Sequence, residues 1–119
     1  MPVEIVVRGH ITGVTSTSLW TLYDQGVARP YGLELPPGLQ RNAALPTPVI
    51  TPTTKAAIGE HDAPISEADL VASGLCDAAL WQQVRDVALA LFARGQTLAR
   101  AAGLVLVDTK YEMGLIDGE

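Results

Sequence analysis

The stretch DAALWQQVRDVALALFARGQTLARAAGLVLV, residues 77–107, decides the fold class of this chain. Its apolar side chains recur at the three-, four- and seven-residue spacing of one helix face: Leu80, Val84, Val87, Leu91 and Leu98. The spacing predicts a helix from Asp77 to Ala102, with Gly103 placed to end it. The apolar run at 104–107 then predicts a strand covered on both faces. A helix followed by a buried strand indicates layered α+β or α/β packing.

Charged residues follow that apolar run at alternate positions, in DTKYEMG, residues 108–114. In an extended chain Asp108, Lys110 and Glu112 share one face, because successive side chains point to opposite sides. We expect them at the carboxyl end of a central strand, where open sheets often bind ligands. Two carboxylates flanking an ammonium group suit a divalent cation and a phosphate. An ordinary solvated strand end is the alternative.

The amino-terminal segment offers a second candidate site. Residues 3–7 are apolar and mostly β-branched except for Glu4, which predicts a strand that Arg8 and Gly9 close. The next stretch, HITGVTSTSLW, reads as a loop with hydroxyl groups and backbone amides available to a ligand. Arg8 at this position suits recognition of a phosphate or carboxylate. A structural ion pair with Glu4 or another acid is equally compatible with the pattern.

The middle of the chain reads as irregular structure. Residues 29–52 are rich in proline, which disfavours a long helix and predicts short extended pieces joined by turns. Ser66, three residues before Asp69, predicts the start of a short helix that ends near Gly74. In the loop between these segments Lys55 and Asp62 are either surface charges or, for Asp62, a possible magnesium ligand.

Composition excludes several classes of function. The chain has 119 residues, enough for one domain, and its net charge of −5 gives no excess of basic residues for a nucleic-acid backbone or an anionic membrane. No apolar run is long enough to span a bilayer and no signal peptide is recognisable, so we expect a cytoplasmic protein. Cys76, the only cysteine, is expected to be a buried apolar residue. The common nucleotide-loop, nucleophile and zinc motifs do not occur.

Three collinear segments resemble the SAICAR synthetase family of purine biosynthesis: PVEIVVRGHITG, TPTTKAAIGEHDAPIS and LVDTKYEMG. The resemblance implies an α+β catalytic fold, with a helix packed on a mixed sheet. It implies that residues 1–119 are the central, catalytic segment of such a domain. The family's nucleotide-binding amino-terminal lobe and its carboxyl-terminal part are expected to lie outside these residues. Complementing lobes or a homo-oligomer are therefore the expected protein partners.

The family is a ligase that joins L-aspartate to the carboxylate of CAIR, an aminoimidazole ribonucleotide, and cleaves ATP to ADP and phosphate. A carboxylate needs this activation, because oxide is a poor leaving group whereas an acyl phosphate can be attacked by an amine. By resemblance, Arg8, Thr12 and Gly13 bind CAIR. Asp108 and Lys110 line the same site as catalytic residues.

The resemblance also implies ATP and Mg²⁺ as cofactors. Lys55 is expected to reach the nucleotide, and Asp62 and Glu112 to bind Mg²⁺ near the ATP phosphates. Val14 stands where some members have Ser, so a hydroxyl contact has to come from Thr15 or a neighbour. We expect little ligase activity from these 119 residues alone, and an inactive remnant that keeps some affinity for anions is the alternative function.

Overall fold

The computed structural model describes residues 3–54 and 63–116. It confirms the α+β class. Its elements in chain order are β1 (Val3–His10), α1 (Leu19–Asp24), a 3₁₀ turn η1 (Pro30–Gly32), β2 (Ala44–Ile50), β3 (Thr53–Thr54), β4 (Ala63–Pro64), α2 (Glu67–Ala72), α3 (Ala78–Ala101) and β5 (Asp108–Tyr111).

Strand β1 is the centre of the sheet. β5 pairs with one edge of β1, while β2 and β3 pair with the other edge in succession, and β4 pairs with β3. Every one of these described pairs is antiparallel, so the expectation of a mixed sheet is wrong. The physical reason is that the chain has reversed direction between β1 and β2, β3 continues β2 in the same direction, and β5 also returns opposite to β1.

Strands β2 and β3 continue a single register along β1. Arg8 pairs with Val49 and Glu4 with Thr53, and between them the Thr51 N–H donates to the Val6 carbonyl at 2.9 Å. The ladder is interrupted at Pro52, which has no N–H to donate. Side chains at equivalent positions of these strands therefore share a face of the sheet.

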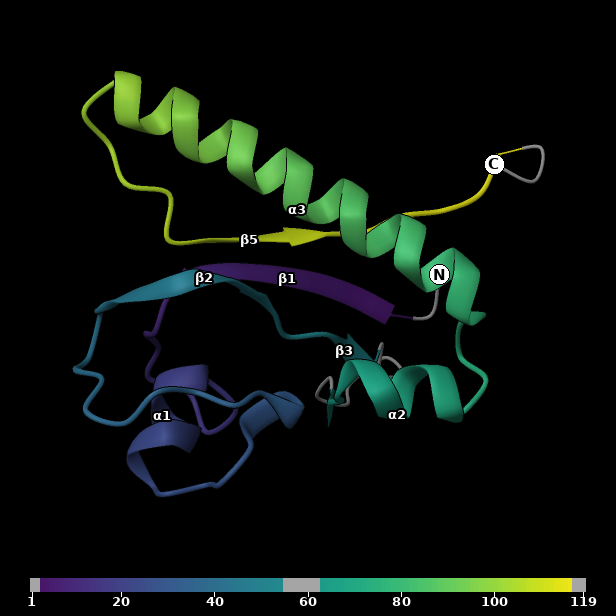
Figure 1. The fold of residues 1–119 in the computed structure, drawn as a ribbon, viewed down its shortest axis with the longest axis horizontal. Helices are drawn as coiled ribbons and strands as arrows, with labels where there is room; N and C mark the ends of the chain where they lie inside the picture. Colours follow the sequence, from purple (N-terminus) through teal and green to yellow (C-terminus); the bar gives the residue numbers. More distant parts are fainter. Residues whose placement is uncertain (1–2, 55–62, 117–119) are drawn as a thin grey trace.

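The alternation along β1 separates a core face from a ligand-accessible face. Val3, Ile5 and Val7 are fully buried and belong to the main core, which α2 and α3 complete. Figure 1 shows α3 lying along this side of the sheet, with α1 and the 3₁₀ turn on the other side. Glu4 and Arg8, at the alternate positions, are only partly buried. The strand runs on to His10, instead of closing at Arg8 and Gly9 as the sequence predicts.

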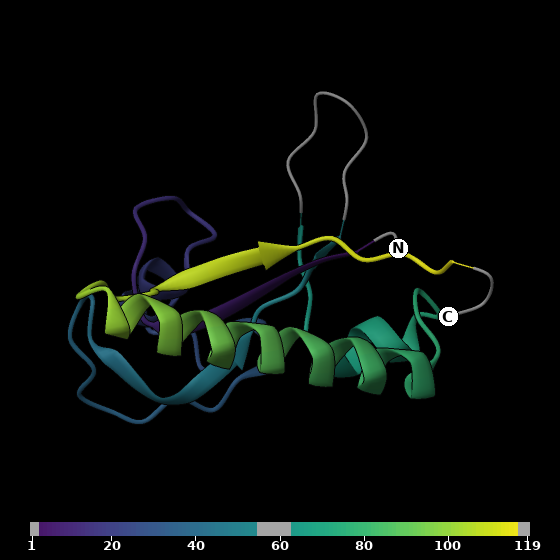
Figure 2. The ribbon, with the colours of Figure 1, turned by 90° about the horizontal axis from the view of Figure 1, so that it is seen from above.

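The predicted long helix is confirmed, but its buried face differs from the predicted one. Asp77 caps the helix by accepting bonds from the backbone N–H groups of Ala79 and Leu80, and Gly103 follows the helix with φ of 76°. The side chains that α3 buries are Trp81, Val84, Ala88 and Phe92. By contrast, half or more of the residue surface stays exposed at Val87, Leu91 and Leu98. Val84 of the predicted stripe is therefore buried, whereas Val87, Leu91 and Leu98 are turned away from the core. Figure 2 shows α3 running lengthwise beside the sheet.

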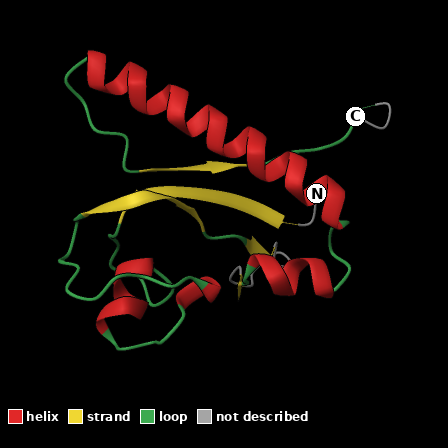
Figure 3. Ribbon diagram, viewed as in Figure 1, coloured by secondary structure: helices red, strands yellow, loops and turns green. Residues whose placement is uncertain are grey.

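The predicted buried strand at 104–107 is wrong. Leu104 and Val105 are 65% and 69% exposed, and the strand starts only at Asp108 (Figure 3). This segment connects the end of α3 to the edge of the sheet. Few of the described residues pack against its side chains there. One backbone hydrogen bond joins this segment to β1: the Gly9 N–H donates to the Val107 carbonyl at 2.9 Å. The central buried strand is β1, and β5 lies at the edge.

The remaining local expectations are confirmed in most details. The Ser66 hydroxyl accepts a bond from the Asp69 N–H and begins α2, and Cys76 is buried in the main core. The proline-rich segment forms the short 3₁₀ turn and β2, as expected. Helix α1 is not predicted by the sequence analysis, which assigns its first residues to a loop. None of the described helices is long and apolar enough to cross a membrane.

Candidate functional site

Three neighbouring strands carry polar side chains on the face of the sheet that is turned away from α3. The pairs Arg8–Asp108 and Val6–Lys110 join β1 to β5, and Thr51 follows β2 opposite Val6. Because paired residues share a face, the alternate charges of β5 meet the alternate polar positions of β1. Sequence positions about 100 residues apart are brought together in this way.

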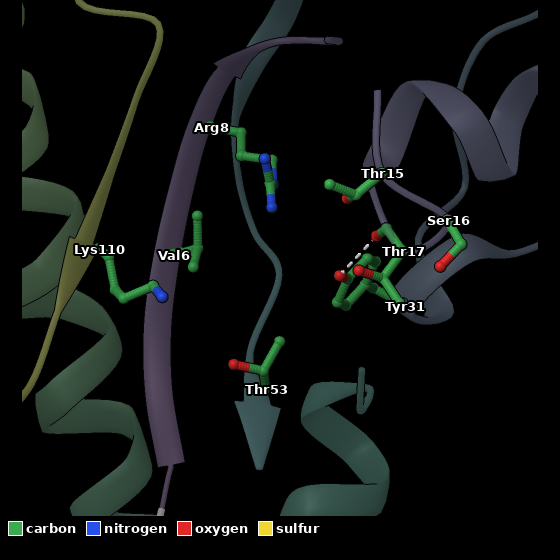
Figure 4. Close-up of a pocket in the computed structure, with 8 residues that line it drawn as sticks. All are labelled: Val6, Arg8, Thr15, Ser16, Thr17, Tyr31, Thr53 and Lys110. Carbon is green, nitrogen blue, oxygen red and sulfur yellow. Dashed lines mark hydrogen bonds between the residues drawn. The ribbon is translucent and has the colours of Figure 1, made fainter. Parts of the chain in front are cut away.

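A cavity of about 420 Å³ lies over this face. We call it the Arg8 pocket, and its lining residues are Val6, Arg8, Thr15, Ser16, Thr17, Tyr31, Thr53 and Lys110. Figure 4 shows Arg8, Val6 and Lys110 projecting from the sheet, with the 15–17 loop and Tyr31 on the opposite side. The Arg8 pocket thus combines two cationic side chains with several hydroxyl groups, which is a suitable lining for an anionic, oxygen-rich ligand.

Arg8 is held at two points. Its Nε donates to the Thr51 hydroxyl at 2.8 Å, and Nη1 lies 3.4 Å from the Asp108 Oδ2. The side chain is only 14% exposed, against 42% for Asp108. Both interpretations of Arg8 from the sequence therefore keep support, because the residue forms an ion pair with an acid and also lines the Arg8 pocket.

Lys110 forms the second cross-strand ion pair of the site. Its Nζ lies 3.1 Å from the Oε2 of Glu4, whose side chain is 13% exposed. That oxygen accepts no hydrogen bond from the described residues, so the contact is a charge pair without hydrogen-bond alignment. Because Arg8 and Lys110 are each matched by an acid, the strands hold the two cations at fixed positions with little net charge.

Tyr31 forms part of the far wall of the Arg8 pocket. Its hydroxyl donates to the Thr17 carbonyl at 2.9 Å, which ties the 3₁₀ turn to the 15–17 loop. Burial raises the pKa of the Tyr31 phenol, and the nearby positive charge of Arg8 opposes part of this shift. The phenol is therefore neutral, and able to donate, at physiological pH.

Thr12 and Gly13 shape the loop beside the Arg8 pocket and do not line it. The Thr12 hydroxyl donates to the Asn42 Oδ1 at 2.6 Å. Gly13 has φ of 121°, and a Cβ at this position would lie 2.3 Å from the Ser18 side chain. The tight turn at Gly13 directs the next residues, Thr15 to Thr17, toward Arg8 (Figure 4).

Of the three residues expected to bind nucleotide or metal, only Glu112 lies within the described residues. Lys55 and Asp62 lie outside the described residues. Glu112 is exposed and follows β5 in the alternation that puts Asp108 and Lys110 on one face. Within residues 3–54 and 63–116, no cluster of three or more acidic, histidine or cysteine side chains is arranged to hold a metal ion.

Three lining or supporting residues were missed by the sequence analysis: Tyr31, Thr51 and Thr53. Thr51 and Thr53 alternate like strand residues, a signal that the neighbouring prolines obscure. Tyr31 reaches the pocket from a 3₁₀ turn distant in sequence, in a left-handed conformation with φ of 54°. No pattern in the sequence indicates that contact.

Comparison with known proteins identifies the family of the chain. A family model described as SAICAR synthetase matches residues 1–119. A putative phosphoribosylaminoimidazole-succinocarboxamide synthase 2 of Mesorhizobium japonicum is 56% identical over 114 residues, which cover 96% of this chain and 36% of the relative. The chain belongs to the SAICAR synthetase family.

Other members of the SAICAR synthetase family give the same result. The phosphoribosylaminoimidazole-succinocarboxamide synthase of Legionella pneumophila (strain Lens) is 52% identical over 113 residues, covering 95% of this chain and 36% of that protein. A solved structure of the Saccharomyces cerevisiae SAICAR synthase complexed with SAICAR superposes with a TM-score of 0.79 at 32% identity, covering 98% of this chain and 34% of that one. The chain spans about a third of the length of the relatives it matches.

Proposed function

We propose that this chain supplies the substrate-binding part of a SAICAR synthase, which joins L-aspartate to CAIR with cleavage of ATP. The observation that carries the proposal is the Arg8 pocket, where Arg8 and Lys110 face hydroxyl groups from the 15–17 loop. CAIR is a phosphorylated ribonucleotide that also carries a carboxylate. Two cations at fixed positions and a set of hydroxyl donors match the charge and the oxygen content of that substrate.

The reaction needs charge neutralisation at its activated carboxylate. The carboxylate oxygen of CAIR attacks the terminal phosphorus of ATP, ADP leaves, and the resulting acyl phosphate is attacked by the amine of aspartate with loss of phosphate and a proton. Lys110, held by Glu4 at 3.1 Å, is suited to stabilise anionic oxygens in this sequence. Asp108 is proposed from the family resemblance to line the same site, where its Oδ2 lies 3.4 Å from Nη1 of Arg8.

The remaining roles are proposed from family resemblance. Thr12 and Gly13 would position the loop over CAIR, Lys55 would contact ATP, and Asp62 and Glu112 would bind Mg²⁺. When bound, the metal offsets charge on the transferring phosphoryl group. Two carboxylates together with waters and the ATP phosphates are a usual ligand set for Mg²⁺.

Ligand binding tests the proposal directly. Isothermal titration with SAICAR should show binding by the chain, while the dephosphorylated nucleoside should bind at least about tenfold more weakly, because its phosphate no longer meets a cation. Arg8→Gln should weaken SAICAR binding by a similar factor. Arg94→Gln, at an exposed position of α3 outside the Arg8 pocket, is the matched control. Equal affinities for nucleotide and nucleoside would contradict the proposal.

Activity separates the proposed ligase from an inactive remnant. SAICAR formation from CAIR, aspartate and ATP would be measured for the chain alone and with the remaining part of a family-length protein supplied separately. We expect activity only in the second case, because ATP binding is proposed to need the further lobe. Binding without activity in either case favours the remnant. The cytoplasmic location stays a prediction, and the Arabidopsis thaliana relative is named as chloroplastic.

A further inference from the structure

Thr51 stands out because it is a polar side chain in a fully buried position. Its exposure is 0%, and it is the one buried polar or charged residue among those that the structure describes. Burying a hydroxyl costs free energy unless it has a hydrogen-bond partner. Here the partner is the Nε of Arg8, at 2.8 Å. A buried hydroxyl is thus used to hold a charged side chain of the candidate site.

The backbone around Thr51 is well fixed. Its N–H donates to the Val6 carbonyl at 2.9 Å, and Pro52 follows with a restricted φ angle. The hydroxyl therefore accepts from Arg8 at a point set by the central strand of the sheet. Since the guanidinium group is planar, fixing its Nε restricts the directions in which its two terminal nitrogens can point.

The Asp108 contact shows why this restriction matters. Asp108 lies 3.4 Å from Nη1, longer than the roughly 2.7–2.9 Å of a close arginine–carboxylate pair. An unrestrained guanidinium would turn to form two short bonds with this carboxylate. With Nε already bound to Thr51, the two-bond arrangement that uses Nε is not available. The single long contact at Nη1 leaves N–H groups of Arg8 available to a ligand in the Arg8 pocket, which Arg8 lines.

We propose that Thr51 is a positioning residue, which orients the Arg8 guanidinium toward the ligand and keeps Asp108 from capturing it. This inference rests on the proposed function, because it assumes that Arg8 binds the anionic substrate. Thr51 itself does not line the Arg8 pocket, so its effect on a ligand is exerted through Arg8. Removing the Thr51 hydroxyl should therefore weaken ligand binding only when residue 8 is an arginine.

The central experiment is a double-mutant cycle read by SAICAR affinity. Thr51→Val keeps the volume and removes the acceptor, and it should weaken binding about tenfold, as expected for a lost hydrogen bond to a charged group. Thr51→Ser keeps the hydroxyl and should restore most of the affinity. In the Arg8→Lys background, which has no Nε, Thr51→Val should change affinity less than twofold. In the Asp108→Asn background its effect should also shrink, because the competing carboxylate is gone.

A second readout needs no ligand, and its first measurement needs no variant. In the unsubstituted chain the Arg8 Nε–H should exchange slowly with solvent in nuclear magnetic resonance spectra, because it is bound to a buried hydroxyl. Exchange should become fast in Thr51→Val. A purely structural role for Thr51 would lower stability without moving this signal selectively. Fast exchange in the unsubstituted chain would overturn the inference, even if every variant at position 51 failed to fold.

The outcomes separate the inference from the proposed function. If Arg8→Gln binds SAICAR like the unsubstituted chain, the proposed function fails. If Arg8→Gln weakens binding and a folded Thr51→Val does not, only the positioning role fails. It fails as well if Thr51→Val weakens binding equally in the Arg8→Lys background, or if Thr51→Ser does not restore affinity. Weaker binding in Thr51→Val, recovery in Thr51→Ser, and a smaller effect of Thr51→Val in both the Arg8→Lys and the Asp108→Asn backgrounds support it.

Discussion

Arg8 and Asp108 face each other across β1 and β5, with Nη1 and Oδ2 3.4 Å apart. The pair lies at the border of the Arg8 pocket, where Asp108 is 42% exposed. Its contribution to stability should be small, since solvent screens partly exposed ion pairs. Its effect on an anion in the pocket should be larger, since the carboxylate both repels the anion and competes for Arg8.

Asp108→Asn should therefore separate stability from anion affinity. We expect the free energy of unfolding to fall by less than about 1 kcal/mol in urea denaturation. We expect inorganic phosphate to bind more tightly, because a negative charge is removed beside the site. Asp86→Asn on α3, which makes the same change of net charge away from the Arg8 pocket, should leave phosphate affinity unchanged. Weaker phosphate binding in Asp108→Asn would show that Asp108 supports the anion directly.

The turn at Gly13 gives a prediction about the pocket wall. Gly13→Ala should destabilise the 13–18 loop strongly, because the new Cβ would lie 2.3 Å from the Ser18 side chain in a backbone with φ of 121°. Gly26→Ala is the matched control, since its φ of 81° is also positive but nothing lies within 4 Å of the added Cβ. The control should cost only the backbone strain, about 1–2 kcal/mol.

Both glycine variants would be measured by urea denaturation and SAICAR titration. We expect Gly13→Ala to weaken SAICAR binding, because Thr15 to Thr17 would be displaced from the Arg8 pocket. Gly26→Ala should bind normally. Identical stability and binding in the two variants would contradict the steric argument at Gly13.

The Tyr31 phenol should lose its proton at a higher pH than an ordinary tyrosine, because its pKa is raised. Burial raises the pKa of its phenol above the ordinary value of 10.0. The stability that comes from the neutral phenol is thus present below pH 10 and is lost as pH rises through the higher pKa of the folded state. An ultraviolet pH titration should show a late ionisation that disappears in Tyr31→Phe. In Arg8→Gln the Tyr31 pKa should rise further, because the opposing positive charge is gone, and a lower pKa there would refute this assignment.

The two faces of α3 should differ sharply in mutational cost. Phe92 is fully buried, and Phe92→Ala should destabilise the chain by about 3–5 kcal/mol. Leu91 is its neighbour in sequence but is 50% exposed, so Leu91→Ala should cost well under half as much. Equilibrium urea denaturation measures both. Equal losses would show that the stripe containing Leu91 is buried in solution, for instance by self-association, which sedimentation would detect.

The sequence was informative where the cause of structure is local. The Asp77 cap, the Gly103 stop and the Ser66 cap bond backbone groups a few residues away, and the structure has all three helix ends close to the predicted positions. The alternation of Asp108 and Lys110 is likewise a property of any extended chain, and it survives in β5. Family membership also followed from the sequence, through three collinear segments.

The sequence failed where burial depends on distant partners. The apolar run at 104–107 looks like a core strand, yet the described residues leave Leu104 and Val105 exposed. On α3 the predicted stripe is only partly buried, because the face that packs against the sheet carries Trp81, Val84, Ala88 and Phe92 and leaves Val87, Leu91 and Leu98 outside it. A hydrophobic side chain favours burial, but its hydrophobicity does not indicate which part of the protein will pack against it.

The sequence by itself determined the class of fold, the ends of α2 and α3, the alternation of charges and the family. Only the tertiary structure decided that Arg8 meets Asp108 and Thr51, and that Lys110 meets Glu4. These contacts follow from the register of β1 with β2 and β5, which joins residues 43 and 100 positions apart from Arg8. Register depends on which face of each strand is buried against the rest of the fold, and the strands that meet here lie far apart in the sequence, so the residues around Arg8 do not specify its partners.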